Sequence, residues 1–238
     1  MNTDLAGKTC LITGANSGIG KATSTALAAA GATVVMVCRD RGRGEEARTE
    51  IVDKSGNQDV DLLIADLSSQ GSVRAAVADF RSRYDRLHLL VNSAAVFLTQ
   101  RRLNDEGLEM MFATNHLGPF LLTNLLLDVL EHSAPSRVIT VTAPSTTRIN
   151  FEDLQGEQKF NATHAFGATK TANLLFTYAL ARRLKEPGMT ANACHPGLVR
   201  TNLMRHAAMP MRLLLRFLNL FAASPETAAK GLLEAASS

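Results

Sequence analysis

Residues 13–20 have the sequence Thr-Gly-Ala-Asn-Ser-Gly-Ile-Gly and directly follow the first apolar, β-branched run of the chain, at 9–12. A helical pattern begins inside this glycine-rich turn and continues to residue 30. In such a position glycines let the backbone approach a pyrophosphate, and the N-terminus of the helix stabilises its negative charge. Glycine-rich turns also simply join strands to helices, so the location between a strand and a helix is what favours a dinucleotide site.

The same alternation of short strand patterns and longer helical patterns continues along the chain. Predicted strands cover 9–12, 33–37, 60–65, 87–91, 137–141 and 189–193, and predicted helices cover 18–30, 42–54, 70–84, 107–132, 165–185 and 226–236. This spacing is typical of right-handed βαβ units. The sequence therefore predicts an α/β fold, with residues 1–238 forming a single Rossmann-type domain around a doubly wound parallel sheet. The longest irregular stretches, 92–105, 143–164 and 196–223, all follow strands, where ligands bind in such sheets.

Composition and charge narrow the function classes. The 238 residues include 25 Lys and Arg against 22 Asp and Glu, and this small, dispersed excess is not typical of a nucleic-acid-binding face. Cys10, Cys38 and Cys194 form no CxxC pair and have no histidine spacing that would hold a metal. Because the first strand pattern begins at residue 9, we expect neither a leader nor a membrane span, and a cytoplasmic protein.

The turn has the spacing G-x-x-x-G-x-G and resembles that of the short-chain dehydrogenase/reductase superfamily. Three phrases are most similar to its retinol-dehydrogenase-like branch: CRD at 38–40, DLQGE at 153–157 and ALARRL at 179–184. A resemblance of this kind concerns the scaffold and not the substrate. Further matches extend the resemblance over nearly the whole chain, at Asp66-Leu67, Asn92-Ser93-Ala94-Ala95, Asn115, Lys170, Pro196-Gly197 and Thr201.

The end of the second predicted strand indicates which cofactor is bound. NAD enzymes place a carboxylate there on the ribose 2′-hydroxyl, whereas NADP enzymes place an arginine near the 2′-phosphate. This chain has Cys38 followed by Arg39, which favours NADPH/NADP+, with Asn16 or Ser17 as further contacts. An exposed arginine without a ligand is the alternative.

The resemblance also implies residue roles: Asp66 at the adenine, Asn92 at the adenosine-side ribose and Thr201 at the nicotinamide end. The full implied cofactor-binding set is Gly14, Asn16, Ser17, Gly18, Ile19, Gly20, Arg39, Asp66, Leu67, Asn92, Ala94, Lys170, Pro196, Gly197 and Thr201.

The active-site positions depart from the family pattern. Family members use Ser, Tyr and Lys with a supporting Asn, the Tyr and Lys lying four residues apart on one helix face. Lys170 and Asn115 are the catalytic candidates, but Phe166 and Ala143 occupy the usual Tyr and Ser positions. Ser145 would be the serine only if the register of its loop slips. A positioned acid contributes roughly 10²–10⁴ in rate and one oxyanion donor roughly 10²–10³, so turnover of a plain ketone should be lost.

Two functions fit these losses. The first is an NADPH-dependent ketoreductase whose substrate, a bulky polycyclic aromatic ketone of the polyketide type, holds the proton in a neighbouring phenol or enol. In this the chain resembles the atypical ketoreductases of angucyclinone antibiotic tailoring, such as the simocyclinone 7-ketoreductase. The second is a catalytically inactive NADPH-binding sensor or regulatory protein. Retinoid oxidation is a third, less favoured function because the tyrosine is absent.

Within the protein, the alternative proton donors are Thr142, Ser145, His164, Thr146 and Ser93, since their segments should face the nicotinamide. Residues 202–222 are rich in Met, Leu and Phe and are expected to cover the substrate, which predicts a small hydrophobic molecule as ligand. An interfacial helix is the competing interpretation. No seventh strand pattern follows residues 226–236, and an uncovered sheet edge favours a homo-oligomer.

Overall fold

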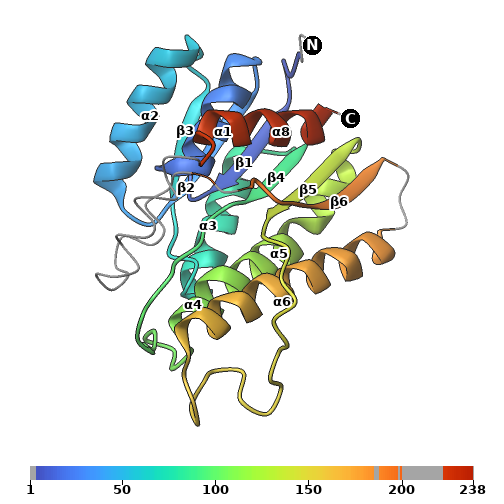
Figure 1. Ribbon diagram of the computed structural model, residues 1–238. Helices are drawn as coiled ribbons and strands as arrows, with labels where there is room; N and C mark the ends of the chain where they lie inside the picture. The colour runs from blue at the N-terminus through green and yellow to red at the C-terminus, as the bar shows by residue number, and fades with distance from the viewer. Residues whose placement is uncertain (1–3, 185–187, 198, 200–221, 238) are drawn as a thin grey trace.

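A computed structural model describes residues 4–184, 188–197, 199 and 222–237. Their core is one sheet of six parallel strands, as predicted, and the strand order is β3-β2-β1-β4-β5-β6 (Figure 1). Beyond β6 a single parallel bridge joins Val199 to Ala223. The strands are β1 (Thr9–Thr13), β2 (Thr33–Cys38), β3 (Val60–Ile64), β4 (Leu89–Asn92), β5 (Ser136–Val141) and β6 (Met189–Cys194).

Helices cover both faces of the sheet, which gives three layers with two apolar cores (Figure 1). Alternate strand residues enter opposite cores: Leu11 packs with α3, α5 and α6, whereas Ile12 packs with α1, α2 and α8. Strands buried on both faces explain the nearly continuous apolar runs in the sequence. The helices are α1 (Gly18–Ala29), α2 (Arg41–Ser55), α3 (Gln70–Arg83), α5 (Gly118–His132), α6 (Ala162–Arg183) and α8 (Pro225–Ser237).

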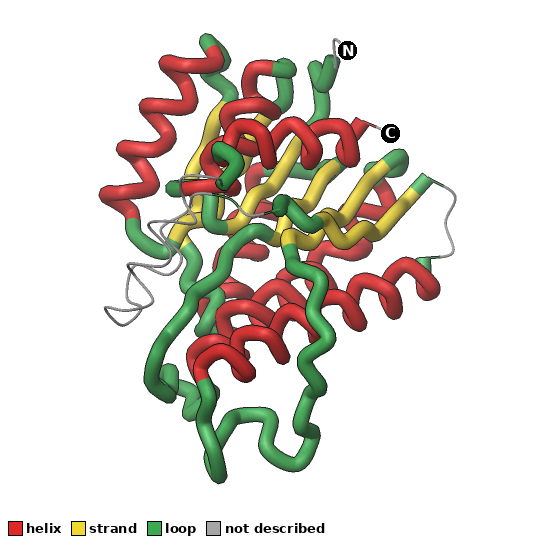
Figure 2. The backbone as a smooth tube through the Cα atoms, viewed as in Figure 1, coloured by secondary structure: helices red, strands yellow, loops and turns green. Residues whose placement is uncertain are grey.

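The strand order reverses between β1 and β4, and the loops that follow these strands meet there. The Thr13 hydroxyl accepts hydrogen bonds from the backbone N–H groups of Ser93 (3.0 Å) and Ala94 (3.1 Å). The long connections from β4 to α4 and from β5 to α6 extend beyond the same edge of the sheet (Figure 2). The structure therefore has, beyond the ends of β1 and β4, the reversal of strand order at which doubly wound sheets bind ligands in a crevice.

Two predicted helices differ from the structure by more than two residues at their start. The single helix expected at 107–132 is instead α4 (Met110–Phe112), a π-helical turn η1 (Ala113–Leu117) and then α5. The expectation was wrong there because Asn115 makes tertiary bonds that a local pattern does not show. The helix expected to begin at 165 begins at Ala162, since the Asn161 side chain accepts a bond from the backbone N–H of His164 and caps it.

The glycine-rich turn tolerates no side chain at Gly20. A Cβ there would lie 2.4 Å from the Gly14 carbonyl oxygen, whereas a Cβ at Gly231 of α8 would meet nothing within 4 Å. We expect Gly20→Ala to lower the free energy of unfolding by about 1–3 kcal/mol through overpacking. The control Gly231→Ala should raise it by up to about 1 kcal/mol, because alanine favours the helix interior. Urea denaturation measures both, and a Gly20→Ala protein as stable as the parent would contradict this geometry.

Candidate active site

The glycine-rich turn forms a backbone cradle at the start of α1. Gly14 has a φ of 68° and Gly18 a φ of 52°, both in the left-handed region that glycine favours. Ser17, the N-cap of α1, makes no side-chain cap bond, and no acidic residue lies in the first turn. The N-terminal N–H groups of α1 are therefore not engaged by a side-chain cap, and the cradle fits a pyrophosphate.

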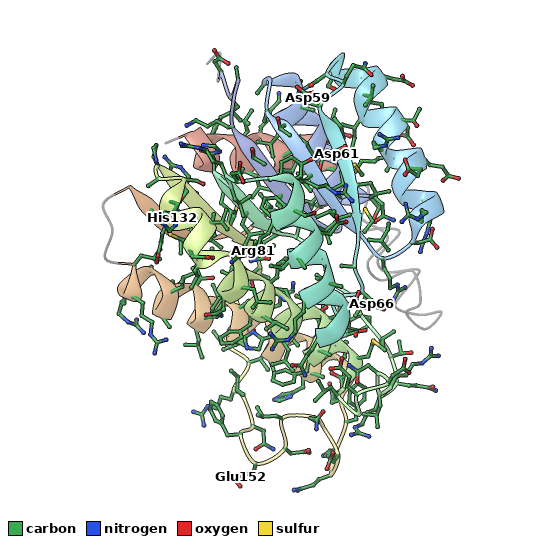
Figure 3. All side chains as sticks on the ribbon, turned by 180° about the vertical axis from the view of Figure 1, so that it is seen from behind. Asp59, Asp61, Asp66, Arg81, His132 and Glu152 are labelled. Atoms are coloured by element: carbon green, nitrogen blue, oxygen red, sulfur yellow. The ribbon has the colours of Figure 1, made fainter. Side chains whose placement is uncertain are left out.

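The end of β2 places a neutral thiol and a cation beside this cradle. Burial raises the pKa of the Cys38 thiol to about 11, and the backbone N–H groups of Asn16 and Ala15 partly oppose the shift. The thiol is therefore protonated and uncharged at neutral pH. Arg39 is exposed, with its guanidinium 4.0 Å from the Asp66 carboxylate, and Figure 3 shows Asp66 beyond β3. Arg39 thus stands at the position that in this fold faces the adenosine ribose.

Asn92 and Leu67 contribute to the site mainly through packing. Asn92 is 3% exposed, and its Nδ2 donates to the Thr123 hydroxyl of α5 (3.0 Å). Among the described residues its Oδ1 has no hydrogen-bond partner. Leu67 is buried, and its carbonyl oxygen would lie 2.2 Å from a Cβ at Gly118. The Asn92 side chain is thus directed toward α5.

Asn115 is buried and joins three segments of the chain. Its Oδ1 accepts from the backbone N–H of Val96 (2.8 Å), and its Nδ2 donates to the Val96 carbonyl (3.0 Å) and the Thr169 hydroxyl (3.4 Å). Thr169 precedes Lys170 on α6. The π-helical turn, the loop after β4 and α6 are therefore held together by one amide.

Lys170 is the only cation that the described part of the chain buries so deeply at this site. It is 8% exposed, and its Nζ lies 5.1 Å from the centroid of the Phe166 ring. No hydrogen bond or ion pair to Nζ is found among residues 4–184, 188–197, 199 and 222–237. Burial lowers the pKa of Lys170 from 10.5 to about 8. An unpartnered buried amine beside the crevice fits a ligand that offers hydroxyl acceptors, such as a ribose.

Three of the alternative proton donors, Thr142, Ser145 and His164, occupy different environments. The Thr142 hydroxyl donates to the Lys170 carbonyl (3.2 Å), and the Ser145 hydroxyl donates to the Gly167 carbonyl (3.0 Å). Each hydroxyl has one proton, and both protons are therefore used on the backbone of α6. His164 lies exposed in the first turn of α6. Ala143 carries no hydroxyl, and of these candidates Thr142 and Ser145 have no free proton for a substrate.

The remaining predicted residues lie at the end of β6. Pro196 and Gly197 follow that strand, and Gly197 has a φ of 76°. Thr201 and all of 202–222 except Ala222 lie outside the described residues, so the expected substrate cover is not tested.

Two residues of this site were missed by the sequence analysis. Thr13 links the loops after β1 and β4, and its signal was a hydroxyl immediately before the first glycine. Asn173 donates to the Asn115 carbonyl (2.9 Å), and its Oδ1 lies 3.0 Å from Nδ1 of His116. In the sequence, Asn173 is a polar residue three positions after Lys170, and therefore on the same face of α6. That spacing could have indicated its part in the site.

A separate surface hollow of about 320 Å³ lies at the loop between β5 and α6. It shares no residue with the cradle or with Lys170, and Glu152, one of its residues, lies at the far tip of that loop (Figure 3). Its lining comprises Leu108, Phe112, Glu152, Asp153, Leu154, Gln155 and Glu157.

Comparison with known proteins identifies the family. The profile of the short chain dehydrogenase family matches residues 8–211, and the chain belongs to this family of oxidoreductases. The chain is 47% identical over 217 residues to retinol dehydrogenase 14 of Mus musculus, covering 86% of this chain and 65% of that protein. It is 43% identical over 228 residues to retinol dehydrogenase 11 of Homo sapiens, covering 95% and 71%. The chain thus spans about two thirds of these relatives.

A solved structure supports the same assignment. The Pseudomonas aeruginosa RhlG/NADP active-site complex is 27% identical, with a TM-score of 0.79, over 100% of this chain and 92% of that chain. None of the helices in the described ranges is both long and apolar enough to span a membrane.

The buried amine of Lys170 should limit the stability of the cofactor-free protein. Because its pKa falls from 10.5 in the unfolded chain to about 8 in the folded one, the unfolded state binds more protons between these values. The free energy of unfolding should therefore rise from pH 8 to pH 10.5. Lys170→Met should add about 3 kcal/mol at pH 7, at about 1.4 kcal/mol per pKa unit, and abolish that rise.

Urea denaturation without cofactor, at intervals from pH 7 to pH 10.5, measures this effect. Lys54→Met is the control, since that lysine is exposed on α2 and its side chain is 63% accessible. A Lys170→Met protein less stable than the parent at pH 7 would show that the ammonium is stabilised where it lies.

Proposed function

We propose that the protein is an NADPH-dependent ketoreductase that reduces a bulky, polycyclic aromatic ketone of the polyketide type without a tyrosine acid. The observation that carries this proposal is the Lys170–Phe166 pair, in which the ammonium faces an aromatic ring and not a phenol. A ketone flanked by a phenol or enol is already polarised by its internal hydrogen bond. Such a substrate depends less on a proton donor and an oxyanion donor of the protein than a plain ketone does.

The residues present fit a nicotinamide dinucleotide phosphate. The cradle of Gly14, Gly18 and Gly20 admits the pyrophosphate, and Arg39 supplies a cation for the 2′-phosphate. Lys170 offers N–H donors for the nicotinamide ribose. When bound, the cofactor supplies the hydride. Holding that hydride against the carbonyl carbon contributes a large part of the barrier reduction even where acid catalysis is weak.

The names of the relatives favour a second substrate class. Proteins called retinol dehydrogenases share 47% and 43% of their aligned residues with this chain. A retinoid is also large and apolar, but its carbonyl or alcohol carries no neighbouring hydroxyl. With Phe166 beside Lys170, this chemistry would lack both the phenol and an internal donor. Firm NADPH binding without turnover would instead support the sensor function.

Arg39 should determine cofactor preference. A guanidinium–phosphate bond is charge-assisted and contributes about 1.5–3 kcal/mol, so Arg39→Ala should weaken NADPH binding by roughly 10- to 100-fold. The affinity for NADH, which lacks the phosphate, should change by less than threefold. Titration of nucleotide fluorescence measures both, with Arg48→Ala as control, since this half-buried arginine of α2 pairs with Glu45. Equal dissociation constants of the parent protein for NADPH and NADH would contradict the assignment.

The substrate class is tested by NADPH oxidation against plain ketones, retinal and aromatic ketones with a neighbouring phenol or enol. We expect turnover only of the hydroxyl-flanked compounds. Phe166→Tyr with Ala143→Ser should restore an acid and an oxyanion donor, and raise turnover of plain ketones by at least about 10²-fold. Each single variant serves as a control. Turnover of retinal or plain ketones by the parent protein would sink the proposal.

A further inference from the structure

The proposed reaction needs a proton that the hydroxyls of Thr142 and Ser145 do not supply. Hydride addition to a carbonyl carbon leaves a negative charge on oxygen, and one proton must be added per turnover. A flanking phenol can pass its own proton to that oxygen, but it then carries the charge itself. The hydroxyls of Thr142 and Ser145 already donate to backbone carbonyls of α6. A proton donor within the site would neutralise that charge before the product leaves.

Lys170 has the position and the free protons for this task. Its Nζ lies on the same face of α6 as Phe166, one helical turn away, and 5.1 Å from the centroid of that ring. A protonated amine has three N–H donors, and within the described residues none has an acceptor. The Phe97 ring packs edge-to-face against the Phe166 ring, with the two centroids 5.5 Å apart. The ammonium thus lies beside the Phe166 ring, nearly buried but with 8% of the residue still exposed.

We propose that Lys170 donates the proton that completes carbonyl reduction in this protein. An N–H bond of Nζ breaks and an O–H bond forms on the oxygen that hydride transfer has left negative, whether on the former carbonyl or on its flanking hydroxyl. The carbonyl carbon is reduced, NADPH is oxidised to NADP+, and the neutral amine takes a new proton from solvent. This role of Lys170 rests on the proposed function, and it names the group that supplies the proton for the proposed reduction.

The acidity of Lys170 suits this role. With its pKa lowered to about 8, the amine is protonated at neutral pH and gives up its proton more readily than an exposed lysine. Burial alone causes the shift. The titratable groups on the packed elements are engaged elsewhere: Glu109 caps α4, His116 of η1 lies 3.0 Å from Asn173, and Nδ1 of His195 lies 3.4 Å from the Thr142 carbonyl.

Lys170→Arg separates proton donation from charge, because a guanidinium keeps its positive charge and its donors but does not release a proton. With a hydroxyl-flanked ketone that the parent protein reduces, kcat should fall roughly 10²- to 10⁴-fold. The dissociation constant for NADPH should change by less than tenfold. The kcat of the parent should decline above about pH 8, and this limb should be absent from the variant. Lys54→Arg on α2 is the matched control.

A second measurement uses the unmodified protein without cofactor or turnover. Competitive acylation of its amines with acetic anhydride at intervals from pH 6 to pH 11, followed by peptide mass spectrometry, gives the titration midpoint of Lys170. A midpoint near 8 supports the proposal, and a midpoint near 10.5 overturns it. This readout holds even if Lys170→Arg does not fold.

The outcomes distinguish the two proposals. Turnover by Lys170→Arg at the rate and with the pH profile of the parent overturns the role of Lys170 and leaves the proposed function intact. Absence of turnover by the parent protein on every carbonyl overturns both.

Discussion

The close approach of Gly14 to Ala94 is the constraint on which the whole site depends. A Cβ at Gly14 would lie 2.9 Å from the Ala94 Cα. The backbone that follows β1 is therefore in direct contact with the backbone that follows β4. The Thr13 hydroxyl fixes this contact by accepting from the two amides that follow β4. The strand order reverses at this contact. The position of the contact therefore determines how far the cradle after β1 and Arg39 after β2 lie from α6, which follows β5.

Local patterns predicted the sheet well because buried parallel strands are apolar along their whole length. The π-helical turn could not be predicted in the same way, since it depends on bonds from Asn115 to Val96, nineteen residues earlier. Asn161 shows the opposite case. Its cap is a local signal at the start of α6, and the predicted boundary at 165 passed over it.

The residue types of the site were predictable, but the directions of their hydroxyls were not. Thr142 and Ser145 lie close to Lys170 and Gly167 in the structure, as their position after β5 suggests, yet both donate away from the crevice. The cause is the tight packing of this loop on α6. A Cβ at Gly167 would lie 2.3 Å from the Thr147 hydroxyl, so the loop approaches the helix backbone directly. Such an approach leaves no trace in spacing or composition.

Lys170 connects the stability of the fold with its chemistry. Burying an ammonium without a counter-charge is costly, and the aromatic face of Phe166 offsets only part of that cost. A phenol at the same position would offer the amine an oxygen; phenylalanine leaves its N–H groups to a ligand. The same desolvation that weakens the cofactor-free protein lowers the pKa of the amine into the range where it exchanges protons near neutral pH. With phenylalanine at position 166, the acid proposed on α6 owes its lowered pKa to the same burial that costs folding energy.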